Sequence, residues 1–297
     1  MHQEGCVILI MDDCIMIKTD YVQQVINNHI KENFWPFYDK PIGRLMNTVY
    51  HRHPGVPNLH TASIKLGTAM EAILLELGNS YRTGVLFPRH IAGYGVSEEE
   101  LQEHQEKKIS LGKSASAKNH NSIAVYSRLS KIDLLPKIET LVLEKKAKKE
   151  KLTINEINEF SSSLLKQLPL DDEINEFFVD MCFLDNNVWV CSEIKSSGDT
   201  DSGKTQSTLT NNLLAPYLAL GNVPKKLFFG IISNNRKLRK DGSWSGAMSR
   251  YLDKDLIKFD EEFLKMIFPP EELSYDVLMD LVEERLNKLH DKYKSVE

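Results

Sequence analysis

The chain of 297 residues is 41% hydrophobic and 27% charged, and its formal net charge is −5. This composition is ordinary for a soluble globular protein and excludes a globally basic surface, so a nucleic acid would have to meet a local basic patch. The four cysteines show neither a CxxC pair nor a zinc-ligand spacing, and no apolar run reaches the roughly 20 residues of a membrane span, so we expect a soluble cytoplasmic protein with reduced thiols.

Helices dominate the first part of the chain. Apolar residues at helical spacing predict helices over 19–33, 61–81 and 153–168. A loop broken by proline and glycine is expected over 50–60, and Gly78-Asn79 is typical of a helix stop.

Polar segments rich in lysine separate the second helix from the third. They cover residues 96–110 and 114–150. The run "LEKKAKKEK" (143–151) is expected to be a solvated helix end rather than a DNA-binding surface.

The second half of the chain carries β-prone segments. The predicted elements are a hairpin within 177–199, a helix over 207–221, a short buried strand over 225–233 and a charged amphipathic helix over 273–293. Helices before and after a short buried sheet predict an α/β fold with a helical N-terminal portion. We place that N-terminal segment at 1–60 and the main domain at 61–297.

Three charged side chains, Asp180, Glu193 and Lys195, interrupt the apolar hairpin. If the intervening Asn186 and Asn187 form a two-residue turn, Asp180 lies directly opposite Glu193 on the neighbouring strand. Side chains alternate between the two faces of a strand, so Lys195 shares the face of Glu193. The turn therefore gathers all three charges into one cluster.

Two carboxylates that face each other repel, and a divalent cation between them relieves the repulsion. Oxygen ligands favour Mg²⁺, so Asp180 and Glu193 are the candidate metal ligands. Lys195 would align an attacking water and offset the charge of a phosphate, which gives the cluster the chemistry of metal-assisted phosphodiester hydrolysis. The alternative is a cross-strand salt bridge on a solvent-facing surface, because Glu-x-Lys triplets are common by accident.

A fourth carboxylate, Glu71, stands in the nearly apolar helix 61–81, with Glu76 about 140° away round the helix. Either Glu71 is a further catalytic residue and metal ligand, directly or through water, or it is the exposed edge of a core helix.

Asp180 and "SEIK" (192–195), with a Glu-bearing helix upstream, resemble the PD-(D/E)xK nuclease superfamily. The continuation "EIKSSGDTDSGKTQSTLTNNLLAPYLALGN" is similar to the segment after the catalytic strand of TdeIII-type type II restriction endonucleases. The later "FFGIISNNRKLRKDGSWSGAMSRYL" resembles a strand and a basic, Trp-containing segment of the same family. The resemblance covers residues 60–270, and it departs from the pattern at Val179, where a proline is usual, and at Ser197, where the family has glycine.

The resemblance implies a restriction-endonuclease-like PD-(D/E)xK core, in which a short mixed sheet is flanked by helices. It also implies a Mg²⁺-dependent endonuclease that cuts double-stranded DNA at a short palindromic site of the GGNCC type, with Asp180, Glu193 and Lys195 as its catalytic residues. A palindromic site mirrors a two-fold protein axis, so we expect a homodimer. A restriction–modification system would also include a cognate DNA methyltransferase encoded nearby.

Basic residues follow the predicted strand over 225–233. The candidate DNA-binding residues are Arg236, Lys237, Arg239, Lys240 and Trp244, together with Lys204 and Gln206 after the catalytic strand. A basic segment of this kind either binds phosphates and reads guanine edges or is only a solvated turn.

Two other functions fit the same residues. A repair or recombination nuclease of the same fold would recognise DNA structure rather than sequence. A catalytically inactive DNA-binding protein would keep the fold alone, but the intact set of Asp180, Glu193 and Lys195 favours an enzyme.

Overall fold

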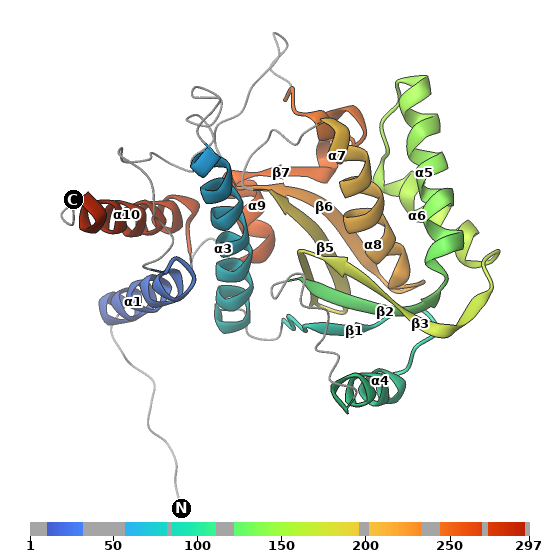
Figure 1. Ribbon diagram of the computed structural model, residues 1–297, viewed down its shortest axis with the longest axis horizontal. Helices are drawn as coiled ribbons and strands as arrows, with labels where there is room; N and C mark the ends of the chain where they lie inside the picture. Colours follow the sequence, from blue (N-terminus) through green and yellow to red (C-terminus); the bar gives the residue numbers. More distant parts are fainter. Residues whose placement is uncertain are drawn as a thin grey trace, which may run out of the picture. The chain divides into compact units, whose positions relative to one another are not determined.

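The computed structural model describes residues 11–31, 57–81, 85–110, 122–195, 202–232, 244–268 and 273–294. The chain divides into two compact units, one formed by Met1–Leu77 with Pro270–Glu297 and the other by Gly78–Pro269. Figure 1 labels most of the helices and strands of both units.

The first unit is helical. Its elements are α1 (Met11–His29), most of α3 (Pro57–Tyr81) and α10 (Tyr275–Lys294). α1 contacts α10, and Arg285 Nε donates a 3.0 Å hydrogen bond to the carbonyl of Ile30. His29 Nε2 lies 2.7 Å from Glu76 Oε2, which joins α1 to α3. The predicted helical N-terminal portion is confirmed.

The bounds of these helices differ from those expected. α3 begins at Pro57, so the loop prediction is wrong for residues 57–60, and its remainder lies outside the described residues. Proline suits the first turn of a helix because the N–H it lacks would have no partner there. Gly78-Asn79 does not end α3 either. A Cβ on Gly78 would lie 2.7 Å from the ring of Phe87, so this glycine permits close packing rather than a helix stop.

The second unit contains two small mixed sheets. The first has the order β1-β2-β3, with β2 parallel to β1 and antiparallel to β3. Its elements are β1 (His90–Ala92), β2 (Ile123–Leu129) and β3 (Leu170–Val179), with α4 (Glu98–Ser110) between β1 and β2 in the chain. β2 and β3 are not predicted from the sequence, because β2 lies inside a lysine-rich stretch and the first half of β3 is acidic.

The second sheet has the order β4-β5-β6-β7, antiparallel between β4 and β5 and parallel thereafter. Its strands are β4 (Met181–Asp185), β5 (Val188–Lys195), β6 (Lys225–Ile231) and β7 (Ile257–Phe259). The predicted hairpin is β4–β5, and the predicted buried strand is β6, so both predictions are confirmed. Two mixed sheets flanked by helices confirm the α/β class.

Helices pack around both sheets. They are α5 (Lys131–Lys148), α6 (Ile154–Leu165), α7 (Ser202–Ser207), the π-helix η2 (Thr208–Leu214), α8 (Ala215–Ala219) and α9 (Asp260–Ile267). Thr153 starts α6 with a capping box completed by Glu156. α7, η2 and α8 follow one another as a single helical column (Figure 1). The run 143–151 is the end of α5 and is almost wholly exposed, as expected.

Helices cover both faces of the second sheet. Asn212 of η2 reaches Glu193, which pairs with Phe229 of β6. The next residue of β6 is Gly230, and a Cβ there would lie 2.3 Å from the ring of Phe263 of α9. Since neighbouring residues of a strand face opposite sides, η2 and α9 lie on opposite faces of the sheet. Among the described residues, none of the helices combines the length and the apolar composition needed to cross a membrane.

Candidate active site

The β4–β5 hairpin has the predicted register. Its two-residue Asn-Asn turn has positive φ angles of 48° and 62°, the conformation that asparagine tolerates well. Backbone pairing runs from this turn to Met181 opposite Ser192. The next opposed pair is therefore Asp180 and Glu193, which confirms the register prediction.

Asp180 occupies the break between the two sheets. It is the single residue between the end of β3 at Val179 and the start of β4 at Met181. Its Oδ2 accepts a 2.9 Å hydrogen bond from the backbone N–H of Ile194. The carboxylate thus accepts a hydrogen bond from β5 where backbone pairing between β4 and β5 has ended. This bond fixes the Asp180 side chain beside β5.

Lys195 joins the two carboxylates. Its Nζ donates to Glu193 Oε1 and lies 3.5 Å from Asp180 Oδ2. The exposed fraction of the side chain is 0% for Glu193, 13% for Asp180 and 30% for Lys195. The three predicted residues therefore meet on one face, with Glu193 at the bottom of the cluster and Lys195 towards solvent.

Burial dominates the electrostatics of Glu193. Desolvation raises the pKa of its carboxyl group well above the usual range, and the neighbouring Asp180 carboxylate raises it further. Lys195 opposes this shift through its charge and its hydrogen bond. A surface salt bridge does not need a fully buried partner, so this burial argues against the solvent-facing alternative.

One oxygen of Glu193 receives no hydrogen bond from a donor group of the described residues. Oε1 accepts from Lys195 and, at 3.2 Å, from Asn212 Nδ2, whereas Oε2 is buried and accepts no such bond. A buried carboxylate oxygen normally has a partner, and such an exception calls for an explanation. Beside a second carboxylate, it fits a hard divalent cation, which takes one or two carboxylates and completes its shell with water. Asp180 and Glu193 would hold such a cation.

Glu71 and the hairpin cluster belong to different units of the chain. Glu71 is half-buried on α3, in the first unit, whereas Asp180 belongs to the second. Within the described ranges, no group of three or more His, Cys, Asp or Glu side chains is arranged to hold a metal. Glu71 as a catalytic residue and ligand stays a prediction.

Of the seven candidate DNA-binding residues, three lie within the described residues and four lie outside them. Lys204 and Gln206 are on α7, with Lys204 exposed and Gln206 Nε2 donating a 3.0 Å bond to Glu139. Trp244 is 8% exposed and meets the ring of Phe259 edge to face at 5.3 Å, so its predicted DNA contact gains no support from this packing. The four others, Arg236, Lys237, Arg239 and Lys240, lie outside the described residues.

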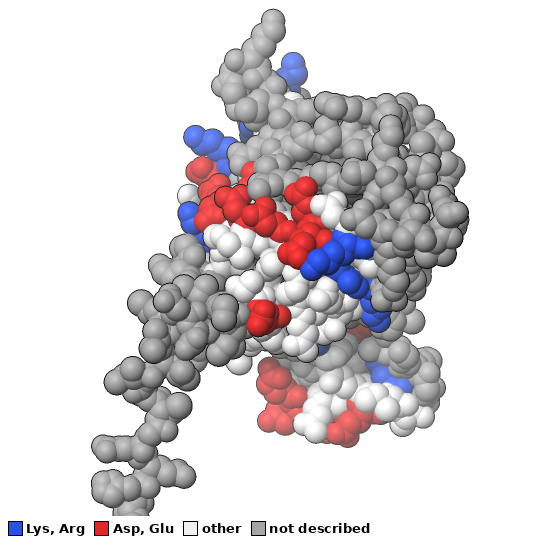
Figure 2. Space-filling view, turned by 90° about the vertical axis from the view of Figure 1, so that its left-hand side faces the viewer, with Lys and Arg blue, Asp and Glu red and all other residues white. Residues whose placement is uncertain are grey.

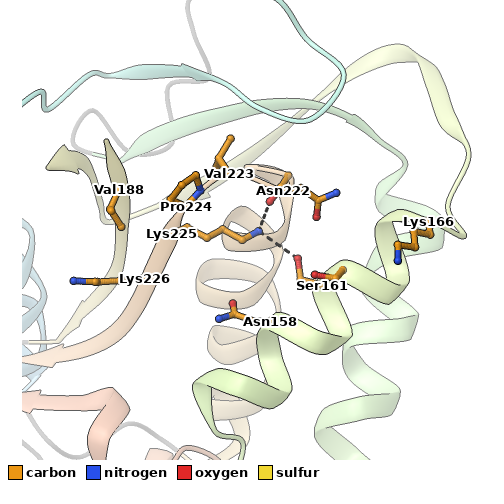
Figure 3. A pocket seen from close by; sticks show the side chains of 11 residues that line it. Asn158, Ser161, Lys166, Val188, Asn222, Val223, Pro224, Lys225 and Lys226 are labelled. Carbon is orange, nitrogen blue, oxygen red and sulfur yellow. Dashed lines mark hydrogen bonds between the residues drawn. The ribbon is translucent and has the colours of Figure 1, made fainter. Parts of the chain in front are cut away.

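A pocket of about 630 Å³ opens elsewhere in the second unit. Figure 3 shows its lining, with Lys225 extending between the loop at Asn222 and Ser161 of α6. Lys225 Nζ donates to the carbonyls of Tyr217 at 2.9 Å and Gly221 at 2.6 Å, and lies 3.3 Å from Ser161 Oγ. These partners use all three of its protons, so Lys225 caps the end of α8 and ties it to β6.

This pocket is remote from the cluster of Asp180, Glu193 and Lys195. It is lined by Val188 and Lys225, which begin β5 and β6, whereas Glu193 and Lys195 lie at the other end of β5. Five residues of strand separate Val188 from Glu193, or about 16 Å. The buried carboxylate of Glu193 and its Oε2 therefore belong to the cluster and not to this pocket.

Asn212 is the site residue that sequence reasoning misses. In the sequence it is one of several polar residues in the helical segment that follows β5, and the sequence does not say which way its side chain points. Comparison of the chain with protein-family models, curated proteins and solved structures finds no match.

Proposed function

We propose that this protein is a Mg²⁺-dependent endonuclease that hydrolyses phosphodiesters of double-stranded DNA. The observation that carries the proposal is the orphan Oε2 of the fully buried Glu193, beside Asp180 and Lys195 on one sheet face. Two carboxylates can hold a divalent cation and a neighbouring lysine can contact the phosphate, and these functions suit metal-assisted hydrolysis.

Each residue has a distinct part in the proposed reaction. Asp180 and Glu193 would hold the cation, which when bound polarises the phosphate and lowers the pKa of a coordinated water. Lys195, the most exposed of the three, would contact the phosphate and orient the water that attacks it. Its ammonium group also offsets the negative charge of the two carboxylates before DNA arrives.

The finer identity rests on the sequence resemblance. We propose a type II restriction endonuclease that acts as a homodimer on a short palindromic site, with GGNCC as the first site to test. DNA would be bound by the basic segment 236–240 and by Lys204. On the face shown in Figure 2, the Lys and Arg side chains of the described residues form no continuous area and lie beside Asp and Glu side chains. The proposal therefore takes the basic segment 236–240 as the surface that meets the polyanion.

The decisive experiment is cleavage of supercoiled plasmid across a Mg²⁺ titration. We expect discrete linear fragments from the parental protein, no cleavage in a chelator, and a loss of several orders of magnitude for Asp180→Asn and for Glu193→Gln. Asp185→Asn is the matched control, because Asp185 ends the same strand β4 on the side of the turn. It should cut at the parental rate.

Fragments that map to one palindrome support a restriction enzyme. Cleavage only at branched or damaged DNA supports a repair nuclease instead. If Asp180→Asn and Glu193→Gln cut as fast as the parental protein, the cluster is a structural ion pair and the proposal fails.

A further inference from the structure

A π-helical turn carries an asparagine to the buried carboxylate. At the end of η2, the backbone N–H of Ala215 donates a hydrogen bond to the carbonyl of Thr210, five residues earlier in the chain. In a regular α-helix, the ring of a proline clashes with the carbonyl four residues before it, and Pro216 stands four residues after Asn212. The wider π turn relieves that clash, so the sequence itself gives a reason for a π segment here, and π segments are frequent at functional sites.

Packing fixes the direction of Asn212. Leu209, Leu213 and Leu214 of η2 are buried and hold the segment in place. Asn212 lies on its exposed side, yet its Nδ2 is 3.2 Å from Oε1 of the fully buried Glu193. Asn212 therefore contacts the buried carboxylate although it is itself exposed.

We propose that Asn212 is a positioning residue, which fixes the Glu193 carboxylate so that Oε2 is presented to a divalent cation. This inference rests on the proposed function. Asn212 and Lys195 both donate to Oε1, so the carboxylate is held by one oxygen, while the described residues offer the other oxygen no donor. Hydrogen bonds that orient a ligating carboxylate in this way typically contribute 10- to 100-fold to metal affinity or activity.

Asn211 provides a matched control. It precedes Asn212 in η2, is also exposed, and donates from Nδ2 to Ser207 Oγ at 3.0 Å instead of to the carboxylate. Asn211→Ala thus removes the same group from the same segment and leaves the hydrogen bonds of Glu193 intact.

The test is calorimetric titration of the full chain with Mn²⁺ in the absence of DNA. We expect Asn212→Ala to bind Mn²⁺ roughly 10-fold more weakly than the parental protein, and Asn211→Ala to bind it equally well. The urea midpoints of the parental protein, Asn212→Ala and Asn211→Ala should agree. A purely structural role of Asn212 would instead lower the midpoint of Asn212→Ala and leave its metal affinity unchanged. With plasmid DNA, excess Mg²⁺ should restore much of the cleavage rate of Asn212→Ala, with KM for DNA unchanged.

The outcomes separate the two proposals. If the parental protein binds no Mn²⁺, the proposed metal-dependent function fails and this inference fails with it. If the parental protein and Asn212→Ala bind Mn²⁺ equally well, only the assignment of Asn212 is overturned. Equal losses in Asn212→Ala and Asn211→Ala would also overturn it, because the effect would then come from the segment.

Discussion

Lys225 should make the stability of the protein rise with pH. Burial lowers the pKa of its ammonium group from 10.5 to about 8. Between these two values the unfolded chain still binds the proton that the folded protein has released, so raising the pH favours the folded state. The whole difference corresponds to roughly 3 kcal/mol, at 1.36 kcal/mol for each factor of ten in proton affinity. Of this, about 2 kcal/mol should be gained between pH 7.5 and pH 10.

The assay compares urea unfolding of the parental protein and Lys225→Met at these two pH values. Other lysines, tyrosines and cysteines also titrate in this range, but they are common to both proteins and cancel in the difference. The parental protein should gain about 2 kcal/mol relative to Lys225→Met on going to the higher pH. A difference that stays the same at both pH values would refute the reasoning, since Lys225 would then titrate alike in the folded and unfolded states.

Two further substitutions test the site and the sheet beneath it. Lys195→Ala should bind Mn²⁺ as well as the parental protein, because both carboxylates remain, but should cleave plasmid at least about 100-fold more slowly; cleavage at the parental rate would favour the salt-bridge alternative. Gly230→Ala should lower the free energy of unfolding by about 1–3 kcal/mol, because its Cβ would lie 2.3 Å from the ring of Phe263. Urea denaturation measures this, and an equally stable variant would contradict the close packing of α9 on β6.

Local patterns account for the hairpin and its charges. The Asn-Asn turn specifies a two-residue connection, and the period of two along a strand then determines which side chains share a face. Asp180, Glu193 and Lys195 could be grouped for this reason, without knowledge of any other element. The same local reasoning misplaces the ends of α3, where Gly78 permits packing against Phe87 and does not stop the helix.

Strands of mixed polar and apolar composition cannot be predicted from local sequence patterns. β2 lies between β1 and β3 in the sheet and is buried along nearly its whole length, although it lies in a lysine-rich stretch. β3 begins with exposed acidic residues and becomes buried only near Phe177 and Val179. Burial of this kind depends on which elements pair, and sequence spacing alone does not specify the pairing.

The sequence by itself determined the turn, the register and the common face of the three charged residues, because these follow from backbone geometry within one hairpin. Only the tertiary structure decided that Glu193 is fully buried, that its Oε2 accepts no hydrogen bond within the described part of the chain, and that Asn212 donates to its Oε1. Asn212 is 19 residues from Glu193 in the chain. Its contact depends on how a π-helical segment packs on the sheet, and that packing is set by the buried leucines of η2 together with the sheet that they cover.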